Sequence, residues 1–536
     1  MTDTEEVDVL IVGGGINGCG TFRDLSAQKV RTLLLEHGDF CQGASAASSR
    51  LMHGGLKYLE TGEFGLVRHS AEERNLLLRN AAHYVRPLPC IVPLRTRFGG
   101  IAGSARRFLG LKGKIADRGS LITRLGMMMY DAYGRNFRAM PRHRMLGRGG
   151  LDKVVAELDT GIIGGAVYYE AQISHAERLG LELVLDGEAL CPGNRALNYA
   201  VVTGREGEVI RYTHDGRDHA VRAKIIVNAG GAWIDKVNGA LGLDSRLMGG
   251  SKGSHLVVDN PALHAALNGH MIYFGTPDGR VNLVYPMQDR VLVGSTDIAV
   301  DDPDRAACDA DEAAYLRNAV AEIFPGIPVT EDQIVFRFCG VRPLPRSDGG
   351  DIGLVTRDSA IAELALPGSA VPVLCLIGGK WTTFRSFSEE ATDAILVRLK
   401  RERRVDTKKM QIGGGRGYPR DEDARRGLVA ALSERYGIGE ARCRELIARY
   451  GTRTGDYLAG LSGSESFLIS APDYSQQEIT WIAQAERVRC VDDILRRRTT
   501  LSLTGRESPA LRDEIADLLP EPRQVESEPQ AVVGIV

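Results

Sequence analysis

The chain has 536 residues, is 43% hydrophobic and 25% charged, and carries a formal net charge of −2, so it is long enough for about two or three domains and gives no reason to expect nucleic acid as a partner. No apolar stretch approaches the roughly 20 residues that span a bilayer, and the acidic N-terminus lacks the basic start and apolar core of a secretion signal. The nine cysteines are scattered singly, without a CxxC pair or a Cys/His cluster, which favours reduced thiols in the cytoplasm and argues against a metal site.

The first predicted unit is a strand, a glycine-rich turn, a helix and a second strand over residues 7–36. Gly13 permits a tight turn, Gly15 lets the backbone approach a pyrophosphate, and Gly18 lets the helix press against the strand. Glu36 follows Gly18 by eighteen residues and can accept hydrogen bonds from ribose hydroxyls. This spacing predicts dinucleotide binding; the alternative is a turn that uses glycine only for packing.

A run of small residues follows at 43–50, which is too poor in bulk to build a core but suits backbone contact with a ligand. The residues expected to line the cofactor there, unless the run is a plain flexible loop, are Ser45, Ala46, Ser48 and Ser49. A helix is predicted next, over roughly 62–82, from apolar residues near helical spacing.

Residues 86–148 form a basic segment, with fourteen Arg or Lys and two acidic residues, interleaved with apolar side chains. Such a segment can lie on an anionic membrane surface, where each well-placed basic residue contributes about 1 kcal/mol. The alternative is a solvated basic face over an ordinary helical subdomain, and the sequence leaves both open.

The middle of the chain is predicted to be mainly β-structure. Strands and turns alternate from 165 to 230, and the last of these strands ends in small residues around Gly230 that we expect beside the cofactor. A second glycine turn, Gly378–Gly379, precedes Lys380 and a helix over 384–399. The other predicted strands are 254–258, 281–285, 291–296, 334–342 and 371–377.

The C-terminal part is predicted to be a separate domain. The charged stretch 400–409 has the composition of a linker, and 410–520 has a helical pattern. The tail, 521–536, is rich in proline and polar residues and is expected to be mobile. The helical domain is expected either to cap the active site or to build a homodimer.

Five motifs in the same order resemble those of the aerobic, quinone-linked, FAD-dependent glycerol-3-phosphate dehydrogenases. The resemblance runs from about residue 5 to 400 and lies in Arg50–Glu60, Ala229–Trp233, Gly294–Asp297, Gly340–Leu344 and Gly378–Arg385.

The resemblance implies an α/β fold of the glucose- and amino-acid-oxidase type, with a Rossmann-type FAD lobe, a β-sheet substrate lobe and a C-terminal helical domain. The oxidoreductase domain would span 1–400, with substrate-lobe parts at about 86–150 and 250–345. The implied reaction oxidises sn-glycerol 3-phosphate to dihydroxyacetone phosphate by hydride transfer to flavin N5, with electrons passed to quinone. The enzyme would then lie on the inner face of the cell membrane.

The resemblance also assigns roles by position. Arg342 and Arg357 would face the substrate with Lys57, Lys380 would lie near the flavin edge, and His53 and Tyr58 would border the reacting carbon. The residues expected to contact FAD are Gly13, Gly15, Gly18, Glu36, Ser45, Ser48, Ser49, Gly54, Gly55, Gly230, Gly378, Gly379, Lys380 and Thr382.

Each assignment has a plainer alternative. Arg342 suits a phosphate dianion but could form a structural ion pair. His53 is the obvious titratable base, because an ordinary imidazole pKa lies near 6.5, or it only shapes the pocket. Tyr58 could pack in a core, and Arg357 could pair with its neighbour Asp358. Lys380 precedes a helix, where the helix dipole disfavours a cation, so we expect it to serve a ligand.

The chain departs from the common pattern at Lys57, where many members have Arg, and at Trp381 and Phe384, which replace Leu or Ile and Tyr. Lysine lacks the bidentate fork of arginine. A related polyol phosphate such as erythritol phosphate is therefore an alternative substrate, and an amino-acid-oxidase-like flavoenzyme is an alternative class. A flavin-binding sensor without turnover and an NAD-dependent dehydrogenase are further alternatives.

Overall fold

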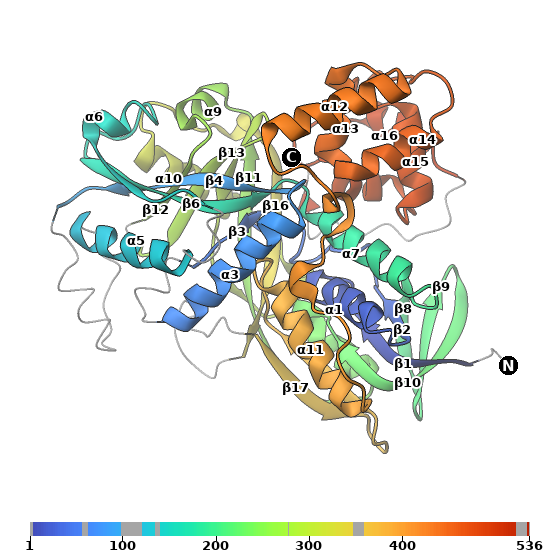
Figure 1. Ribbon diagram of the computed structural model, residues 1–536. Helices are drawn as coiled ribbons and strands as arrows, with labels where there is room; N and C mark the ends of the chain where they lie inside the picture. Colours follow the sequence, from blue (N-terminus) through green and yellow to red (C-terminus); the bar gives the residue numbers. More distant parts are fainter. Residues whose placement is uncertain are drawn as a thin grey trace.

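Two β-sheets and a C-terminal helical domain organise the chain (Figure 1). The computed structural model describes residues 4–55, 63–97, 120–134, 140–276, 278–346, 359–520 and 533–534. Within these ranges, no helix combines the length and the apolar character needed to cross a bilayer.

The first sheet has the strand order β17-β18-β10-β1-β2-β7, in which β18, β10, β1, β2 and β7 run parallel to one another. Its strands are β1 (Thr4–Val12), β2 (Thr32–Leu35), β7 (Arg195–Leu197), β8 (Val201–Glu206), β9 (Val209–His214), β10 (Arg217–Asn228), β17 (Ala360–Ala365) and β18 (Pro372–Ile377). Three helices, α1 (Ile16–Ala27), α7 (Ala176–Leu190) and α11 (Phe384–Arg398), lie side by side against it (Figure 1).

The apolar run at 7–12 forms a central strand because both of its faces are buried. Val9 and Ile11 pack with α1, α7 and α11, whereas Leu10 and Val12 pack into the core on the opposite face. A parallel strand covered on both faces has this continuous apolar sequence. The predicted βαβ unit is therefore β1, α1 and β2.

The second sheet has the order β19-β16-β11-β14-β13-β12-β4-β6-β3, with β5 paired to β6 and β15 paired to β11. It takes in 51–52 and 164–173 in addition to the predicted substrate-lobe ranges. Its strands are β3 (Leu51–Met52), β4 (Val85–Leu94), β5 (Arg144–Gly147), β6 (Gly164–Ile173), β11 (Met248–Val258), β12 (Met271–Gly275), β13 (Val281–Met287), β14 (Arg290–Gly294), β15 (Ile298–Val300), β16 (Ile334–Pro345) and β19 (Val533–Gly534).

Helices cover the second sheet on its two faces. The helices α9 and α10 contribute to one core, and α3 and α5 to the other. The helices of this part and of the connection between the sheets are α3 (Phe64–Asn80), α5 (Ser120–Gly134), α6 (Arg148–Leu151), α8 (Ile234–Ala240), α9 (Pro261–Leu267) and α10 (Ala310–Ile323).

The C-terminal domain is helical, as the sequence predicts, and Figure 1 shows its helices gathered above α7. The tail 521–536 lies outside the described residues except for 533–534, which pair with β16. The elements of the domain are α12 (Glu422–Tyr436), α13 (Glu440–Tyr450), α14 (Thr454–Gly460), α15 (Gln476–Ala485), the π-helical η8 (Asp493–Arg498) and α16 (Pro509–Ala516).

The segment 165–230 contains a long helix, α7, where the sequence reading expects only strands and turns. Within α7, the apolar residues between Leu179 and Leu185 alternate with other residues, which imitates a strand. The helix has almost no exposed face, because its charged residues are buried in ion pairs such as Arg178–Glu486. The usual polar stripe of a surface helix is therefore absent from its sequence.

The stretch 400–409 is bound to the first sheet and to α1 rather than hanging between domains. Arg401 forms an ion pair with Asp8 of β1 at 3.0 Å, and Arg403 forms one with Asp24 of α1 at 2.9 Å. The charged composition that suggests a linker therefore serves specific surface contacts.

Candidate cofactor and substrate site

The turn between β1 and α1 has the geometry of a phosphate-binding loop. Gly13 has φ +112°, and a Cβ there would lie 2.5 Å from the carbonyl oxygen of Ala229. A Cβ on Gly18 would lie 1.9 Å from the oxygen of Gly13, so only glycine fits at both positions. At Gly15, by contrast, a Cβ would meet only Ser45 Oγ, at 3.4 Å. This opening lets a ligand approach the start of α1.

The N-terminus of α1 is suited to an anion. Gly15 caps the helix without a side-chain hydrogen bond, and the first turn contains no acidic residue. The backbone N–H groups and the positive end of the helix dipole therefore face the turn, and the first turn of the helix supplies no carboxylate of its own. The three predicted glycines thus have the positions that a pyrophosphate requires.

Glu36 ends β2 beside this turn. Its carboxylate accepts hydrogen bonds from the N–H of Gly14 at 2.5 Å and from the N–H of Gly38 at 2.9 Å. Burial raises the pKa of Glu36, and these two N–H donors act in the opposite direction. Each carboxylate oxygen has a second lone pair, so the group can still accept from ribose hydroxyls.

The second glycine turn lies against the first. The Asn17 side chain donates to the carbonyl of Gly378 at 3.0 Å, and a Cβ on Gly379 would lie 2.5 Å from the same amide nitrogen. The Asn17 Oδ1 atom is buried, and no donor within the described ranges reaches it. A buried acceptor at the start of α1 fits a ligand donor there, and sequence reasoning missed it because Asn17 occupies a variable place in the glycine pattern.

Ser45 links three parts of the site. Its hydroxyl accepts from the N–H of Ile16 at 3.0 Å, and its carbonyl accepts from the Trp381 indole at 2.9 Å. The adjoining Thr382 accepts the backbone N–H of His53 at 3.2 Å. The structure therefore brings together the glycine turn, the small-residue run, the His53 loop and the second glycine turn. Gly230 joins them, because its N–H borders the space that Gly13 leaves open.

Two of the hydroxyls predicted to line the cofactor, those of Ser48 and Ser49, contact other groups of the protein. Ser48 Oγ accepts from the N–H of Arg50 at 3.2 Å, and Ser49 Oγ lies 2.7 Å from Nε2 of His255. His255 is buried and stacks on Phe338, with ring centroids 4.8 Å apart. Burial, with Arg342 and Arg50 nearby, lowers its pKa to about 3, so it is neutral at physiological pH. Sequence reasoning missed His255 because it lies within a predicted strand and in no recognisable motif.

A buried polar cluster fixes the loop after His53. The N–H of Gly54 donates to Glu170 Oε2 at 2.9 Å and to the Tyr130 hydroxyl at 3.2 Å. Arg74 donates to the same two groups, at 2.8 Å and 2.6 Å. A Cβ on Gly54 would lie 2.2 Å from the Tyr130 hydroxyl, so glycine is needed there. Tyr130, Glu170 and Arg74 do not belong to any sequence motif, so sequence reasoning could not have identified them.

Arg342 projects from β16 into a set of oxygen acceptors. Its guanidinium forms an ion pair with Asp297 at 3.0 Å and donates to Ser295 Oγ and the Thr296 carbonyl, both at 3.1 Å. A Cβ on Gly253 would lie 2.3 Å from its Nη2, so that glycine provides the space. The predicted structural ion pair therefore exists, and 27% of the Arg342 side chain is still exposed.

The strand that carries Arg342 touches the cofactor-lining run. A Cβ on Gly340 would lie 2.7 Å from the Ala47 side chain. Arg342 follows Gly340 by two residues and lies near His255, which contacts Ser49 of the same run. Lys57, Tyr58 and Arg357, which the resemblance places with it, lie outside the described residues.

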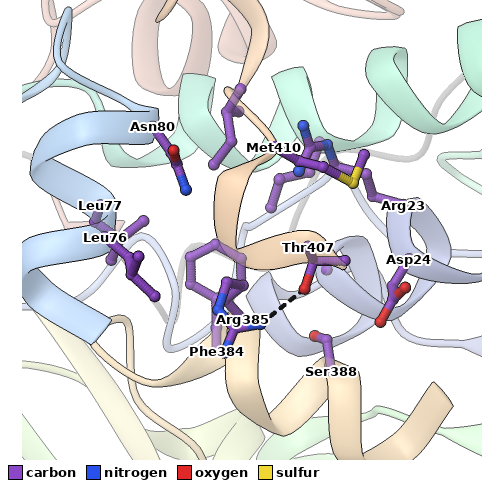
Figure 2. A pocket seen from close by; sticks show the side chains of 13 residues that line it. Arg23, Asp24, Leu76, Leu77, Asn80, Phe384, Arg385, Ser388, Thr407 and Met410 are labelled. Atoms are coloured by element: carbon purple, nitrogen blue, oxygen red, sulfur yellow. Dashed lines mark hydrogen bonds between the residues drawn. The ribbon is translucent and has the colours of Figure 1, made fainter. Parts of the chain in front are cut away.

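The second glycine motif ends in two cations with different surroundings. Lys380 lies on the loop between β18 and α11, and its Nζ is buried. Arg385 points away toward Glu73 of α3, at 2.6 Å, and also contacts Glu389 and Thr407. Figure 2 shows Arg385 and Thr407 in a small cavity between α1, α3 and α11 that has room for roughly one water molecule. Arg385 is therefore structural, whereas Lys380 adjoins the second glycine turn.

Comparisons with known proteins agree with this geometry. Residues 8–379 match the FAD dependent oxidoreductase family, and residues 405–528 match the C-terminal domain of alpha-glycerophosphate oxidase. A glycerol-3-phosphate dehydrogenase of Synechocystis is 33% identical over 522 residues, which is 92% of this chain and 89% of the relative. An aerobic glycerol-3-phosphate dehydrogenase of Staphylococcus epidermidis is 30% identical and covers 93% and 87%.

The solved structure of a glycerol-3-phosphate dehydrogenase from Bacillus halodurans, complexed with FAD, is similar in fold. It aligns with a TM-score of 0.70 at 22% identity and covers 96% of this chain and 91% of that one. The cofactor is FAD, and the predicted flavoprotein fold with its helical C-terminal domain is confirmed. The open helix N-terminus and the buried Asn17 acceptor fit this cofactor.

Proposed function

The chain belongs to the family of FAD-dependent glycerol-3-phosphate dehydrogenases, and from this premise we propose that it oxidises sn-glycerol 3-phosphate to dihydroxyacetone phosphate. The observation that carries the proposal is the fixed guanidinium of Arg342 beside the cofactor-lining run. A planar cation with several N–H donors suits a phosphate dianion better than a neutral substrate.

FAD, when bound, would supply the redox chemistry as the acceptor of the hydride from the alcohol carbon. The N-terminus of α1 would hold its pyrophosphate and Glu36 its ribose. We assign Lys380 to stabilise negative charge near the flavin. Its placement after Gly379, before the start of α11, supports this role.

We assign His53 to take the proton of the substrate hydroxyl. Two backbone contacts support the assignment, because the N–H groups of His53 and Gly54 are held by Thr382 and by the Tyr130–Glu170 pair. A base must be held in position before its pKa matters. A His53→Gln variant should lose kcat strongly and lose the acidic limb of the pH–rate profile; an unchanged profile would assign the proton to another group.

The departures from the family pattern do not require a larger substrate. Trp381 uses its indole N–H on the Ser45 carbonyl and packs edge-on against Phe384, with ring centroids 6.2 Å apart. Both bulky residues thus serve internal packing. Lys57, Tyr58 and Arg357 enter the proposal by resemblance alone, as a substrate-phosphate contact, a pocket hydroxyl and a second cation.

We further propose quinone as the electron acceptor and the surface of an anionic membrane as the place of transfer. The basic segment 86–148 supports this proposal. Its described helix α5 exposes Arg124 and 54% of Met128, while Met127 and Tyr130 are buried. A helix with cationic and apolar groups on its outer side suits a lipid interface. Loss of quinone reduction when anionic vesicles are omitted at low salt would support it, and equal rates with neutral vesicles would refute it.

The substrate is tested by dye reduction with the purified flavoprotein. We expect kcat/KM for glycerol 3-phosphate to exceed that for erythritol 4-phosphate, and no turnover with glycine or sarcosine. A higher kcat/KM for erythritol 4-phosphate would identify that compound as the substrate and leave the proposed mechanism unchanged. Turnover of an amino acid alone would overturn the proposed function.

A further inference from the structure

The buried carboxylate of Asp39 joins the loop that follows β2 to the C-terminal domain. Asp39 lies on the loop that follows β2 and Glu36, and it has no exposed surface. Arg498 of η8 grips it with two parallel bonds, at 2.7 Å to Oδ2 and 3.0 Å to Oδ1, although 459 residues separate the two. Arg497 adds a bond at 2.7 Å, and the Asn198 amide adds one at 2.9 Å.

The two arginines are themselves held from behind. Arg497 also pairs with Asp493 of η8 at 2.7 Å, and Arg498 donates to the carbonyl of Glu486 at 2.9 Å. Burial alone would raise the pKa of Asp39, but Arg498 and Arg497 lower it to about 2. The cluster of two carboxylates and two guanidiniums is thus charge-balanced, and breaking one member leaves a buried charge without its partner.

The loop that Asp39 anchors wraps around the first glycine turn. Glu36 accepts the N–H of Gly14, and the carbonyl of Gly14 accepts the N–H of Cys41 at 2.9 Å. A Cβ on Gly14 would lie 2.8 Å from the Phe40 ring, which closes the loop over the turn. A displacement of Asp39 would therefore move both Glu36 and the Gly14 backbone.

A second ion pair crosses the same interface from α7, a helix that packs against Cys41 of this loop, but its hydrogen bonds go to Glu486 and not to Asp39. Arg178 of α7 grips the buried carboxylate of Glu486 at 2.6 Å and 2.7 Å. Its carboxylate, like that of Asp39, is fully buried and bound by an arginine fork. The two pairs differ in what they hold, because the Glu486 side chain is bound by Arg178 and Arg453. Arg498 meets Glu486 through the backbone carbonyl, which Glu486→Gln keeps.

We propose that the C-terminal domain retains FAD by holding the Glu36 loop through Asp39, which makes Asp39, Arg497 and Arg498 positioning residues for the adenosine end of the cofactor. The domain predicted either to cap the active site or to build a dimer thus acts on the side of the dinucleotide. This role concerns binding of FAD and is independent of which polyol phosphate is oxidised.

The test compares Asp39→Asn with Glu486→Gln in the FAD-loaded, full-length protein. Release of flavin is followed by its fluorescence after dilution, at temperatures where far-UV circular dichroism shows the chain folded. We expect Asp39→Asn to release FAD at least tenfold faster than the unmodified protein, and Glu486→Gln to lower Tm similarly but to change the release rate less than twofold.

Equal release rates in the two variants would overturn the proposal, as would release from Asp39→Asn that occurs only when the chain unfolds. If Asp39→Asn does not fold, Arg497→Lys and Asn198→Ala carry the same comparison, because each removes a contact to Asp39 and leaves the carboxylate in place. Release about threefold faster in either variant, with Tm close to that of the unmodified protein, supports the role. Unchanged release in both overturns it.

Discussion

Removal of the Arg342 guanidinium should weaken substrate binding in two ways. The side chain supplies the N–H donors proposed for the substrate phosphate, and it neutralises Asp297, which is 3.0 Å away. In Arg342→Ala, Asp297 keeps the hydroxyl of Ser251 as a hydrogen-bond donor but loses the Arg342 guanidinium. The substrate would then lose its contacts to Arg342 and meet a carboxylate that this guanidinium no longer offsets.

The magnitude follows from the bonds involved. A hydrogen bond to a charged group contributes roughly 1.5–3 kcal/mol, and about 1.4 kcal/mol is a factor of ten in affinity. Loss of one such bond raises KM for glycerol 3-phosphate roughly 10- to 150-fold, and repulsion from Asp297 adds to this. The double variant Arg342→Ala with Asp297→Asn should therefore recover part of the loss.

The assay is steady-state dye reduction, with the flavin-to-protein absorbance ratio as the control. Arg342 contacts acceptors on β11 and on the 295–297 turn, so we expect FAD content to stay unchanged. A KM within twofold of the unmodified enzyme would refute the placement of Arg342 at the phosphate. Loss of FAD along with activity would show instead that the residue supports the fold of the cofactor side.

Three further predictions use other parts of the site. Gly18→Ala places a methyl group 1.9 Å from the Gly13 carbonyl oxygen, so the purified variant should lack FAD. The control Gly427→Ala should keep FAD, because a Cβ at position 427 has no neighbouring atom within 4 Å. Equal flavin absorbance in the two variants would contradict the glycine-turn geometry. Tyr130→Phe removes a hydroxyl that holds the loop after His53, so kcat should fall roughly 2- to 12-fold at constant FAD content, since such a bond contributes roughly 0.5–1.5 kcal/mol. An unchanged kcat would separate this cluster from catalysis. The pKa of His255 is about 3 in the folded chain, below its ordinary 6.5, so the unfolded chain binds more protons between these values and stability falls as pH drops through this window, by about 2 kcal/mol at pH 5; urea unfolding at pH 7 and pH 5 should show a smaller loss for His255→Gln, and an equal loss would refute the assignment.

The sequence predicts those parts of the site that depend on neighbours along the chain. A side chain at Gly13 or Gly18 would clash with the backbone, so glycine at these positions is visible in the sequence. Glu36 follows at the distance that one helix and one strand require. The second glycine turn is found in the same way. Order and spacing were sufficient for these elements because the βαβ unit is local.

Contacts between distant segments leave no such pattern. The Tyr130–Glu170 pair joins α5 to β6, and each residue alone has the appearance of a core position. Asp39 and Arg498 are 459 positions apart in the sequence, so no local sequence pattern around either residue predicts the contact between them. The helix α7 was missed because burial on all sides removes the polar stripe on which helix prediction depends.

The order of strands in the first sheet has a consequence for biosynthesis. Its parallel core pairs β1 with β10 and β10 with β18, so the first strand made by the ribosome waits for partners that emerge far later. The second glycine turn, which touches Asn17, follows the last of these strands. A nascent chain can therefore complete its nucleotide-binding site only after more than two thirds of translation is finished. FAD would then bind late in synthesis or after it.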